Sequence, residues 1–110
     1  MMEQLFVYGS LQDPVVQDTL IGRTIEGQAD TLLGYRINMT LMPPYPVALP
    51  AHNHPIDGLI LQVSAEELIK LDVYEGECYL RVRITLESQQ EAWVYIGNPA
   101  CYSDDDRQTD

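Results

Sequence analysis

Five of the chain's seven prolines fall in one stretch, MPPYPVALPAHNHP, between Met42 and Pro55. Proline has no amide N–H to donate, and its ring clashes with a preceding helical turn, so this stretch can be neither a helix nor a central strand. It must be a stiff loop or a broken sheet edge in the middle of the chain. Because 110 residues suit one domain, the regular elements of that domain have to lie on either side of it.

The N-terminal side predicts a strand, a tight turn and a helix in quick succession. The apolar run Leu5–Tyr8 fits a buried strand. Asp13 is a good N-cap, Pro14 a good first helical residue and Gly22 a natural stop. Residues 32–37, LLGYRI, then predict a strand that bends or bulges at its glycine.

The C-terminal side predicts a strand from Ile56 to Val63, with Gly58 inside it, followed by a helix. Ser64 and Glu67 have the spacing of a capping box, in which each side chain bonds the other residue's backbone N–H. The helix is predicted to end around Asp72, with the sequence VYEGE forming a turn.

The clearest strand of the chain follows this turn, because every second residue is apolar while the residues between them are polar or amphipathic. The apolar residues are Leu80, Val82, Ile84 and Leu86. A turn at Gln89–Gln90 and a last strand, Ala92–Ile96, predict a hairpin. Strands outnumber helices, which predicts an α+β domain with a curved or barrel-like sheet.

The net charge of the chain indicates which kinds of ligand or partner it can bind. The formal net charge is −11, and four acids against Arg107 lie in the tail Ser103–Asp110. Phosphate binding needs a basic face, so nucleic acid is excluded as a partner, whereas a small or cationic ligand is compatible with this charge. The tail has no apolar residue to bury, so the domain is predicted to span residues 1–102 and the tail 103–110 to be disordered.

The remaining compositional signals predict a cytoplasmic protein. No apolar run approaches the ~18 residues of a membrane span, and the N-terminus lacks the basic and apolar regions of a signal peptide. Cys78 and Cys101 fit no metal or redox spacing, which favours reduced thiols in the cytosol.

Two short stretches are candidates for a site. At Tyr8-Gly9-Ser10-Leu11 a strand end meets a helix start, which exposes backbone N–H groups that can bind a carboxylate or oxyanion, although an ordinary glycine turn explains the same pattern. Glu75, between Tyr74 and Gly76, could be partly desolvated there, with a pKa raised into the range of a general base. The alternative is a solvated turn glutamate.

Other candidate sites are weaker. His52 and His54 could share one face of a strand and bind a metal, but they lie in the proline-rich stretch and have no third ligand nearby. Ser10 could pair with either histidine as a nucleophile, but the Gly-x-Ser-x-Gly pattern of such serines is absent around it. We therefore predict no metal and no cofactor.

These pieces occur in an order that resembles a known family. The stretches, in chain order, are FVYGSL, DP, LLGYR, YPVALP, IDGLIL, SAEELIKLDVYEG and CYLRVRI. The series resembles the gamma-glutamylcyclotransferase-like family, closest to its small gamma-glutamylaminecyclotransferase-type members, over Leu5–Ile96. The Tyr-Gly-Ser-Leu and Leu-Asp-x-Tyr-Glu-Gly motifs are specific as a pair. The resemblance implies a small mixed β-barrel with a few short helices and a cavity at its mouth.

The resemblance also implies roles for residues. The family's glycine turn holds the glutamyl end of the substrate through backbone groups, which here belong to Tyr8, Gly9, Ser10 and Leu11. The glutamate of the family's Tyr-Glu-Gly segment accepts the proton, which is Glu75 here. Tyr79 and Arg81 match a Tyr-x-Arg pattern, and either line the cavity or form its outer surface. Tyr45-Pro46 is a candidate rim, with a rigid proline loop as the simpler reading.

The implied reaction needs no nucleophile from the protein. The α-amine of a gamma-glutamyl amine attacks its own γ-carbonyl, which closes a five-membered ring and expels the other amine, so that the products are 5-oxoproline and a free amine. The chain has Gln12 where many relatives have arginine, so the amine that is released does not carry over. Two alternatives remain open: a non-catalytic module of the same fold that binds a small metabolite, and, with less support, an interaction or scaffold protein.

Overall fold

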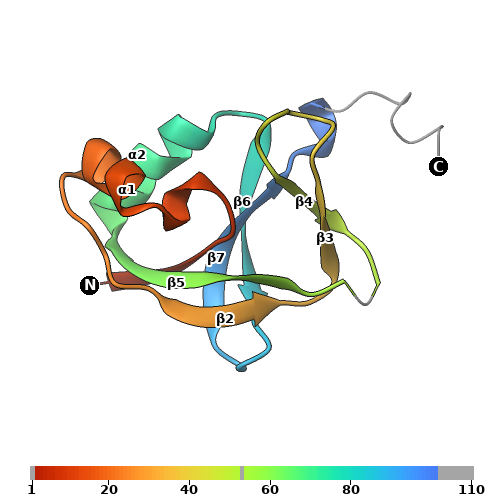
Figure 1. Cartoon of the computed structure of the whole chain (residues 1–110), viewed down its shortest axis with the longest axis horizontal. Helices are drawn as coiled ribbons and strands as arrows, with labels where there is room; N and C mark the ends of the chain where they lie inside the picture. Colours follow the sequence, from red (N-terminus) through yellow and green to blue (C-terminus); the bar gives the residue numbers. More distant parts are fainter. Residues whose placement is uncertain (1, 53, 102–110) are drawn as a thin grey trace.

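The computed structural model describes residues 2–52 and 54–101, so the predicted tail at 103–110 lies outside the described residues. Its main sheet has five strands in the order β2-β5-β1-β7-β6. These strands are β1 (Met2–Val7), β2 (Gln28–Leu32), β5 (Ile56–Ser64), β6 (Tyr79–Thr85) and β7 (Glu91–Gly97). Two longer helices and two short 3-10 helices complete an α+β domain, as the sequence predicts (Figure 1).

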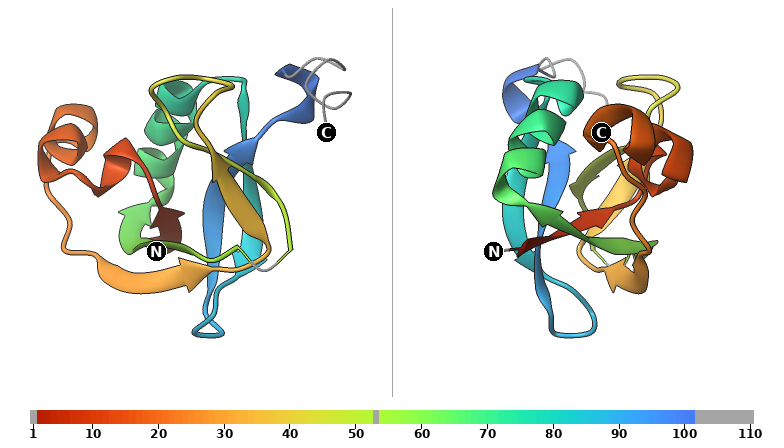
Figure 2. Two further views of the ribbon diagram at one scale, coloured as in Figure 1. Left: turned by 45° about the vertical axis from the view of Figure 1, so that its right-hand side comes forward. Right: turned by 90° about the vertical axis from the view of Figure 1, so that its left-hand side faces the viewer.

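The sheet is strongly curled. In Figures 1 and 2, β2 and β5 run across the direction of β6 and β7. β1 joins the two halves, because it pairs antiparallel with β5 on one side and parallel with β7 on the other. The sheet does not close into the barrel that the resemblance implied. Instead, the edge strand β2 meets the β6–β7 turn through a backbone bond from Glu87 N–H to Thr31 O of 2.9 Å.

The curl divides the core into two clusters of buried side chains. The first, around Leu5, Val7 and Leu61, lies under the helices. The second, around Phe6, Ile60 and Val94, lies on the other face of the same strands. Neighbouring residues of β1 therefore alternate between two buried faces, which explains why the run LFV at its end is continuously apolar.

The predicted N-terminal helix is confirmed. The 3-10 helix η1 (Ser10–Gln12) turns the chain out of β1, and α1 (Pro14–Ile21) follows directly. The Asp13 carboxylate accepts the Val15 N–H at 2.9 Å as the N-cap, and Gly22 ends the helix in the left-handed conformation that glycine tolerates best.

The second helix begins where predicted and ends later. In α2 (Ala65–Glu75), both reciprocal bonds of the Ser64–Glu67 capping box are present. The expected end at Asp72, with a turn after it, is wrong by three residues, because the helix continues through VYE to Glu75. Its stop is Gly76, which has a φ of 82° and donates its N–H to Asp72 O at 3.1 Å. The continuation places Glu75 on a helix end rather than in a free turn.

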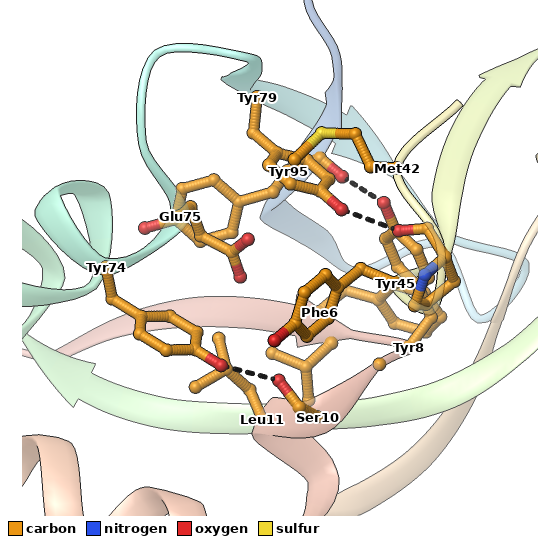
Figure 3. Close-up of a pocket in the computed structure, with 13 residues that line it drawn as sticks. Phe6, Tyr8, Ser10, Leu11, Met42, Tyr45, Tyr74, Glu75, Tyr79 and Tyr95 are labelled. Carbon is orange, nitrogen blue, oxygen red and sulfur yellow. Dashed lines mark hydrogen bonds between the residues drawn. The ribbon is translucent and has the colours of Figure 1, made fainter. Parts of the chain in front are cut away.

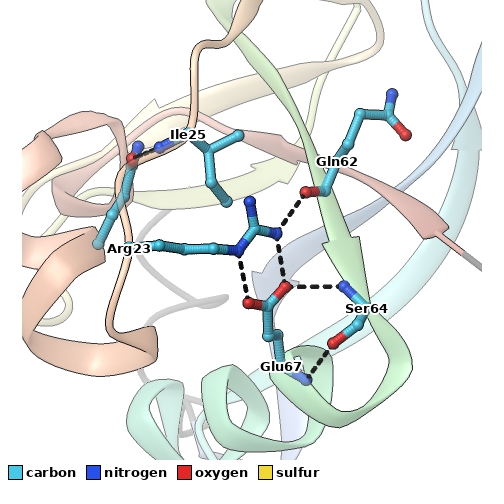
Figure 4. Close-up of polar contacts among 6 residues, drawn as sticks. Arg23, Ile25, Gln62, Ser64 and Glu67 are labelled. Atoms are coloured by element: carbon cyan, nitrogen blue, oxygen red, sulfur yellow. Dashed lines mark hydrogen bonds and ion pairs between the residues drawn. The ribbon is translucent and has the colours of Figure 1, made fainter.

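An ion pair ties the start of α2 to the segment that follows α1 (Figure 4). The Arg23 guanidinium donates to both carboxylate oxygens of Glu67, each at 2.7 Å, and also to Gln62 O at 3.1 Å. The same carboxylate accepts the Ser64 N–H at 2.9 Å. The hydrogen bonds from Arg23, the chief cause, and Ser64 outweigh the opposing effect of burial and lower the pKa of Glu67 to about 2.

Glu67→Gln is expected to lower the free energy of unfolding at pH 7 by about 1 kcal/mol, because Arg23 is partly exposed and solvent screens the pair. A depressed folded-state pKa stabilises above the unfolded value of 4.5, and that contribution disappears as the pH falls toward about 2. The difference between wild type and variant should therefore shrink across this window in urea titrations. The exposed neighbour Glu66 offers the control, and an equal effect of Glu66→Gln would contradict the assignment.

The proline-rich stretch forms a broken edge, one of the predicted alternatives. β3 (Tyr35–Asn38) and β4 (Val47–Pro50) make a separate two-stranded sheet. The single bent strand expected over residues 32–37 is instead the end of β2 and the start of β3, separated at Gly34, whose φ is 88°. β4 lies close to β7, and the loop between β3 and β4 reaches over the end of the main sheet that faces away from the β6–β7 turn (Figure 1).

The expectation of reduced thiols is wrong. Cys78, just before β6, and Cys101, in the 3-10 helix η2 (Pro99–Cys101), form a disulfide. A second contact joins the same segments, because the Asn98 amide donates to Glu77 O at 2.8 Å. The disulfide and this bond fasten the segment directly after α2. No helix within the described ranges is long and apolar enough to cross a bilayer.

Candidate functional site

A pocket of about 190 Å³ opens where the end of β1, the β3–β4 loop and the end of α2 meet (Figure 3). Its lining comes from five parts of the chain: residues 6–11, residues 42, 45 and 46, residues 74 and 75, Tyr79 of β6 and Tyr95 of β7. The volume is below the roughly 300–1,000 Å³ of sites that enclose drug-sized ligands. It therefore suits a small ligand of about amino-acid size.

Glu75 points its carboxylate into this pocket from the C-terminal end of α2 (Figure 3). The side chain is half-buried, and burial raises its pKa to about 7. Among the described residues no hydrogen bond reaches the carboxylate, so no local donor offsets the loss of solvation. A carboxyl group with a pKa near 7 can both accept and release a proton at neutral pH, which is the property of a general acid–base group.

The glycine turn lines the pocket opposite Glu75. Gly9, Ser10 and Leu11 lead from β1 into η1, and the first N–H groups of a helix have no acceptor within it. These backbone donors are suited to an anionic group of a ligand. The Ser10 hydroxyl hydrogen-bonds the Tyr74 hydroxyl at 2.9 Å, which joins the turn to the end of α2 on one side of the pocket. Ser10 is thus paired with a tyrosine and not with a histidine.

Gly9 is needed for space rather than for a special backbone angle. A Cβ built on Gly9 would lie 3.1 Å from Cγ of Pro46. Pro46 belongs to the proline-rich stretch and lines the pocket beside the turn. The glycine therefore lets the β3–β4 loop approach the end of β1 closely, and the two together shape the cavity.

Two tyrosine hydroxyls hold that loop in place. The Tyr8 hydroxyl donates to Tyr95 O at 2.6 Å and accepts the Ala48 N–H at 3.1 Å. The Tyr79 hydroxyl donates to Pro46 O at 2.8 Å. Both residues line the pocket, so these two side chains fix its shape.

The structure separates Tyr79 from Arg81, which the sequence pattern grouped together. Arg81 does not line the pocket, and its guanidinium donates to both carboxylate oxygens of Asp72 at 2.7 and 3.1 Å while stacking on Trp93. The Tyr95 hydroxyl also donates to Asp72, at 2.7 Å. Burial opposes ionisation of Asp72, but the bonds from Arg81 and Tyr95 hold its pKa below the usual value. Arg81 thus contacts the pocket only through Asp72 and Tyr95.

Several lining residues escaped the sequence analysis, namely Phe6, Val7, Met42, Tyr74 and Tyr95. Tyr74 could have been suspected from its place beside Glu75, whereas Tyr95 lies in a strand whose partners only the fold reveals. Tyr45 and Pro46, considered as a rim, do line the pocket.

The histidines lie elsewhere. His52 and His54 are both exposed between β4 and β5, and neither lines the pocket. Within the described ranges, no group of three or more His, Cys, Asp or Glu side chains could hold a metal ion.

Comparison with known proteins identifies the family of the chain. The profile of the family described as gamma-glutamyl cyclotransferase, AIG2-like, matches residues 5–110. AIG2-like protein A of Arabidopsis thaliana is 36% identical over 84 residues, which are 76% of this chain and 51% of that protein. Protein AIG2 C of the same plant is 29% identical, over 91% of this chain and 67% of its own length. The chain thus spans about half the length of AIG2-like protein A.

Solved structures share the fold. A solution structure from Arabidopsis thaliana superposes with a TM-score of 0.77 at 27% identity, covering 98% of this chain and 82% of its own. A structure described as gamma-glutamyl cyclotransferase gives a TM-score of 0.71 at 12% identity, covering 89% and 68%, respectively. An AIG2-like protein from Mus musculus gives 0.67 at 20% identity, covering 94% and 81%. The chain belongs to the AIG2-like gamma-glutamyl cyclotransferase family.

Proposed function

We propose that the protein is a gamma-glutamylamine cyclotransferase, which converts a gamma-glutamyl amine into 5-oxoproline and a free amine. The observation that carries the proposal is Glu75, a half-buried carboxylate that points into a small pocket opposite a glycine turn. The family supports cyclotransferase chemistry in general, and the pocket supplies the particular residues.

The substrate's glutamyl end would lie between the turn and Glu75. Backbone N–H groups of Gly9, Ser10 and Leu11 would hold either the α-carboxylate or the developing oxyanion at the γ-carbonyl. The α-ammonium would then face the Glu75 carboxylate. The rings of Tyr8 and Tyr79 would form the wall that keeps the chain of the substrate folded. Such folding, which brings amine and carbonyl together, is worth several kcal/mol of the barrier.

Glu75 would pass two protons in turn from the attacking nitrogen to the leaving nitrogen. Its carboxylate first takes a proton from the α-ammonium, and the freed amine attacks the γ-carbonyl carbon. A carbon–nitrogen bond forms to close the five-membered ring, and the original amide bond breaks as Glu75 gives that proton to the leaving nitrogen. The ring nitrogen then loses its second proton to the Glu75 carboxylate, which passes it to the released amine. The products are 5-oxoproline and an ammonium ion, so charge and atoms balance without water or cofactor. This acid–base work contributes about 10²–10⁴-fold in rate.

Arg81 would act on the pocket indirectly, through Asp72. It fixes the carboxylate to which the Tyr95 hydroxyl donates, and Tyr95 lines the pocket. We therefore assign Arg81 a positioning role, whereas sequence reasoning had left open whether it lines the cavity.

A cytoplasmic location stays a prediction of the sequence, although disulfides such as Cys78–Cys101 are uncommon in the cytoplasm.

The second candidate is a module that binds a small glutamate-like metabolite without turning it over. The carboxylate of Glu75 argues against it, because an anion-binding pocket gains nothing from a buried acid.

The decisive experiment incubates the purified protein with gamma-glutamyl-ε-lysine, gamma-glutamyl dipeptides, glutathione and gamma-glutamyl alkylamides, and measures 5-oxoproline by mass spectrometry. Product formation supports the enzyme. Binding by calorimetry without product from any substrate would favour the module.

The pH dependence of turnover provides a separate prediction. Because Glu75 has a pKa of about 7 and must be ionised to accept the proton, kcat/KM should fall about tenfold per pH unit below 7. Steady-state rates between pH 5 and 9 would measure this. A profile that stays flat down to pH 5 would exclude Glu75 as the base.

A further inference from the structure

The pocket offers no cation to an anionic group of a ligand. No lysine, arginine or histidine is among the described residues that line it, and Arg81, outside the lining, is bound to Asp72. The α-carboxylate of a gamma-glutamyl substrate must therefore be held by neutral hydrogen-bond donors. Besides backbone N–H groups, the lining supplies side-chain hydroxyls. The residues that carry one are Tyr8, Ser10, Tyr45, Tyr74, Tyr79 and Tyr95.

Three of these hydroxyls already donate their hydrogen to the protein. The Tyr8 hydroxyl donates to Tyr95 O at 2.6 Å, and the Tyr79 hydroxyl donates to Pro46 O at 2.8 Å. The Tyr95 hydroxyl donates to the Asp72 carboxylate at 2.7 Å. Because a hydroxyl has a single hydrogen, a ligand could use these donors only by breaking the bonds that hold the pocket in shape.

The hydroxyls of Ser10 and Tyr74 differ, because they share one hydrogen bond of 2.9 Å in which either can be the donor. That bond uses the hydrogen of one hydroxyl and leaves the hydrogen of the other to donate. Among the described residues, no other hydrogen bond of either side chain takes it up. Tyr74 is 40% exposed, so this hydrogen is accessible to a ligand that enters the pocket.

The Ser10–Tyr74 pair also lies in a suitable place for the α-carboxylate. The α-ammonium and the α-carboxylate of the substrate are bonded to one carbon atom, so the donor for the carboxylate has to lie near Glu75. Tyr74 directly precedes Glu75 at the end of α2, and Ser10 belongs to the glycine turn. In the view of Figure 3, the two hydroxyls meet below the Glu75 carboxylate.

The Tyr45 hydroxyl is the rival donor, but it is less well prepared. Tyr45 belongs to the β3–β4 loop and is 51% exposed. The bond between Ser10 and Tyr74 fixes both hydroxyls before a ligand arrives, which lowers the entropy lost on binding.

From this donor and its position, we propose that the Tyr74 hydroxyl, oriented by Ser10, donates a hydrogen bond to the α-carboxylate of the substrate. The inference rests on the proposed cyclotransferase activity and adds a binding residue to its glutamyl site. A carboxylate accepts several hydrogen bonds, so the hydroxyl can act beside backbone N–H groups of the turn.

Tyr74→Phe keeps the ring and removes the hydroxyl. The α-carboxylate does not react, so its hydrogen bond stabilises the bound substrate and the transition state alike. For the gamma-glutamyl amine that is turned over fastest, we expect KM to rise at least about tenfold while kcat changes less than about threefold. A merely structural effect on the end of α2 would displace Glu75 and lower kcat instead. An unchanged KM would overturn the inference.

Ser10→Ala tests whether the two hydroxyls act as a unit. It should raise KM in the same direction, because the Tyr74 hydroxyl loses the partner that orients it. The double variant should be no worse than Tyr74→Phe alone, since both changes remove one interaction. Effects on KM that multiply in the double variant would contradict the orienting role of Ser10.

A matched pair of ligands tests the carboxylate directly and without turnover. L-5-oxoproline and 2-pyrrolidinone share one lactam ring and differ in the carboxylate. At pH 6, where Glu75 with its pKa of about 7 is mostly neutral, the wild type should bind 5-oxoproline more tightly in NMR titrations. Tyr74→Phe should lose at least about tenfold of this preference. Tyr45→Phe removes the rival hydroxyl and should keep the preference, so a loss in Tyr45→Phe instead would refute the assignment.

The inference and the proposed function fail differently. If no gamma-glutamyl amine gives 5-oxoproline, the proposed activity fails, whereas the ligand pair still tests Tyr74. If the wild type binds neither ligand, binds both alike, or shares its preference with Tyr74→Phe, the inference fails even where turnover is found.

Discussion

The Glu75→Gln variant is expected to release 5-oxoproline at least 10²-fold more slowly than the wild type, and to be the more stable protein above pH 7. The loss of rate follows from removing the one carboxyl group among the described residues that line the pocket. Glutamine keeps the size of the side chain and the end of α2, so substrate binding should change little. Single-turnover assays and calorimetric titration with a gamma-glutamyl amine would separate the two effects.

The gain in stability has a definite pH window. Burial raises the pKa of Glu75 from 4.5 to about 7, so the folded protein retains a proton that the unfolded chain releases between these values. The free energy of unfolding therefore falls as pH rises through the window, by up to about 3 kcal/mol. Glutamine carries no charge and avoids this loss. Wild type and variant should be alike near pH 4 and diverge by pH 8.

Glu77→Gln is the matched control, because Glu77 is exposed in the segment just after α2. It should change neither turnover nor the pH dependence of stability. If Glu75→Gln retains full activity, another group takes the proton. If its urea midpoint at pH 8 equals that of the wild type, the carboxylate is better solvated than the structure implies.

Slower turnover together with higher stability of Glu75→Gln would also explain why the glutamate lies at a helix end. Burial disfavours the ionised form of Glu75, and an ionised carboxylate is in general also unfavourable at the C-terminal end of a helix, where the backbone carbonyls carry partial negative charge. The resulting instability is the same property that makes the group a usable base at pH 7. Function and stability thus oppose each other at this one residue.

Local signals predicted the elements well because their causes are local. The Ser64–Glu67 capping box and the Asp13 N-cap act within one helical turn, and each is visible in the sequence. The end of α2 was misplaced for a local reason as well. Gly76 is a stronger stop than Asp72, because its φ of 82° is positive, and glycine adopts such a backbone conformation far more readily than other residues.

The candidate site could be predicted only in part, because the residues that line a pocket come from parts of the chain that are far apart in the sequence. The glycine turn and Glu75 were found through their motifs, but they line one cavity only because β1 pairs with β7 and α2 packs beside them. Tyr95 is 87 residues from Tyr8, which it binds, and no local pattern connects them. The pairing of Cys78 with Cys101 was missed for the same reason.

Gly58→Ala is expected to destabilise the protein by about 3 kcal/mol or more, the largest effect on stability of any change considered. Gly58 lies in β5 beside the end of its paired strand β1, and an added Cβ would overlap the backbone oxygen of Val7 and lie 2.7 Å from Cζ of Phe6. Backbone paired in a sheet cannot move aside cheaply. Thermal melting should show a midpoint lower by roughly 10–20 °C.

Gly9→Ala is the contrasting control. It adds the same methyl group as Gly58→Ala, but close to a loop instead of a paired strand. Its Cβ would meet only the Pro46 ring, at 3.1 Å, and that ring belongs to a loop that can shift by a few tenths of an ångström. We expect it to cost less than about 1 kcal/mol in stability but to reduce turnover, because Pro46 lines the pocket.

A Gly58→Ala protein that melts within a few degrees of the wild type would mean that β1 is not held against β5 at this point. The turn that β1 carries into the pocket would then lack its rigid support, and the geometry proposed for the glutamyl end would have to be revised.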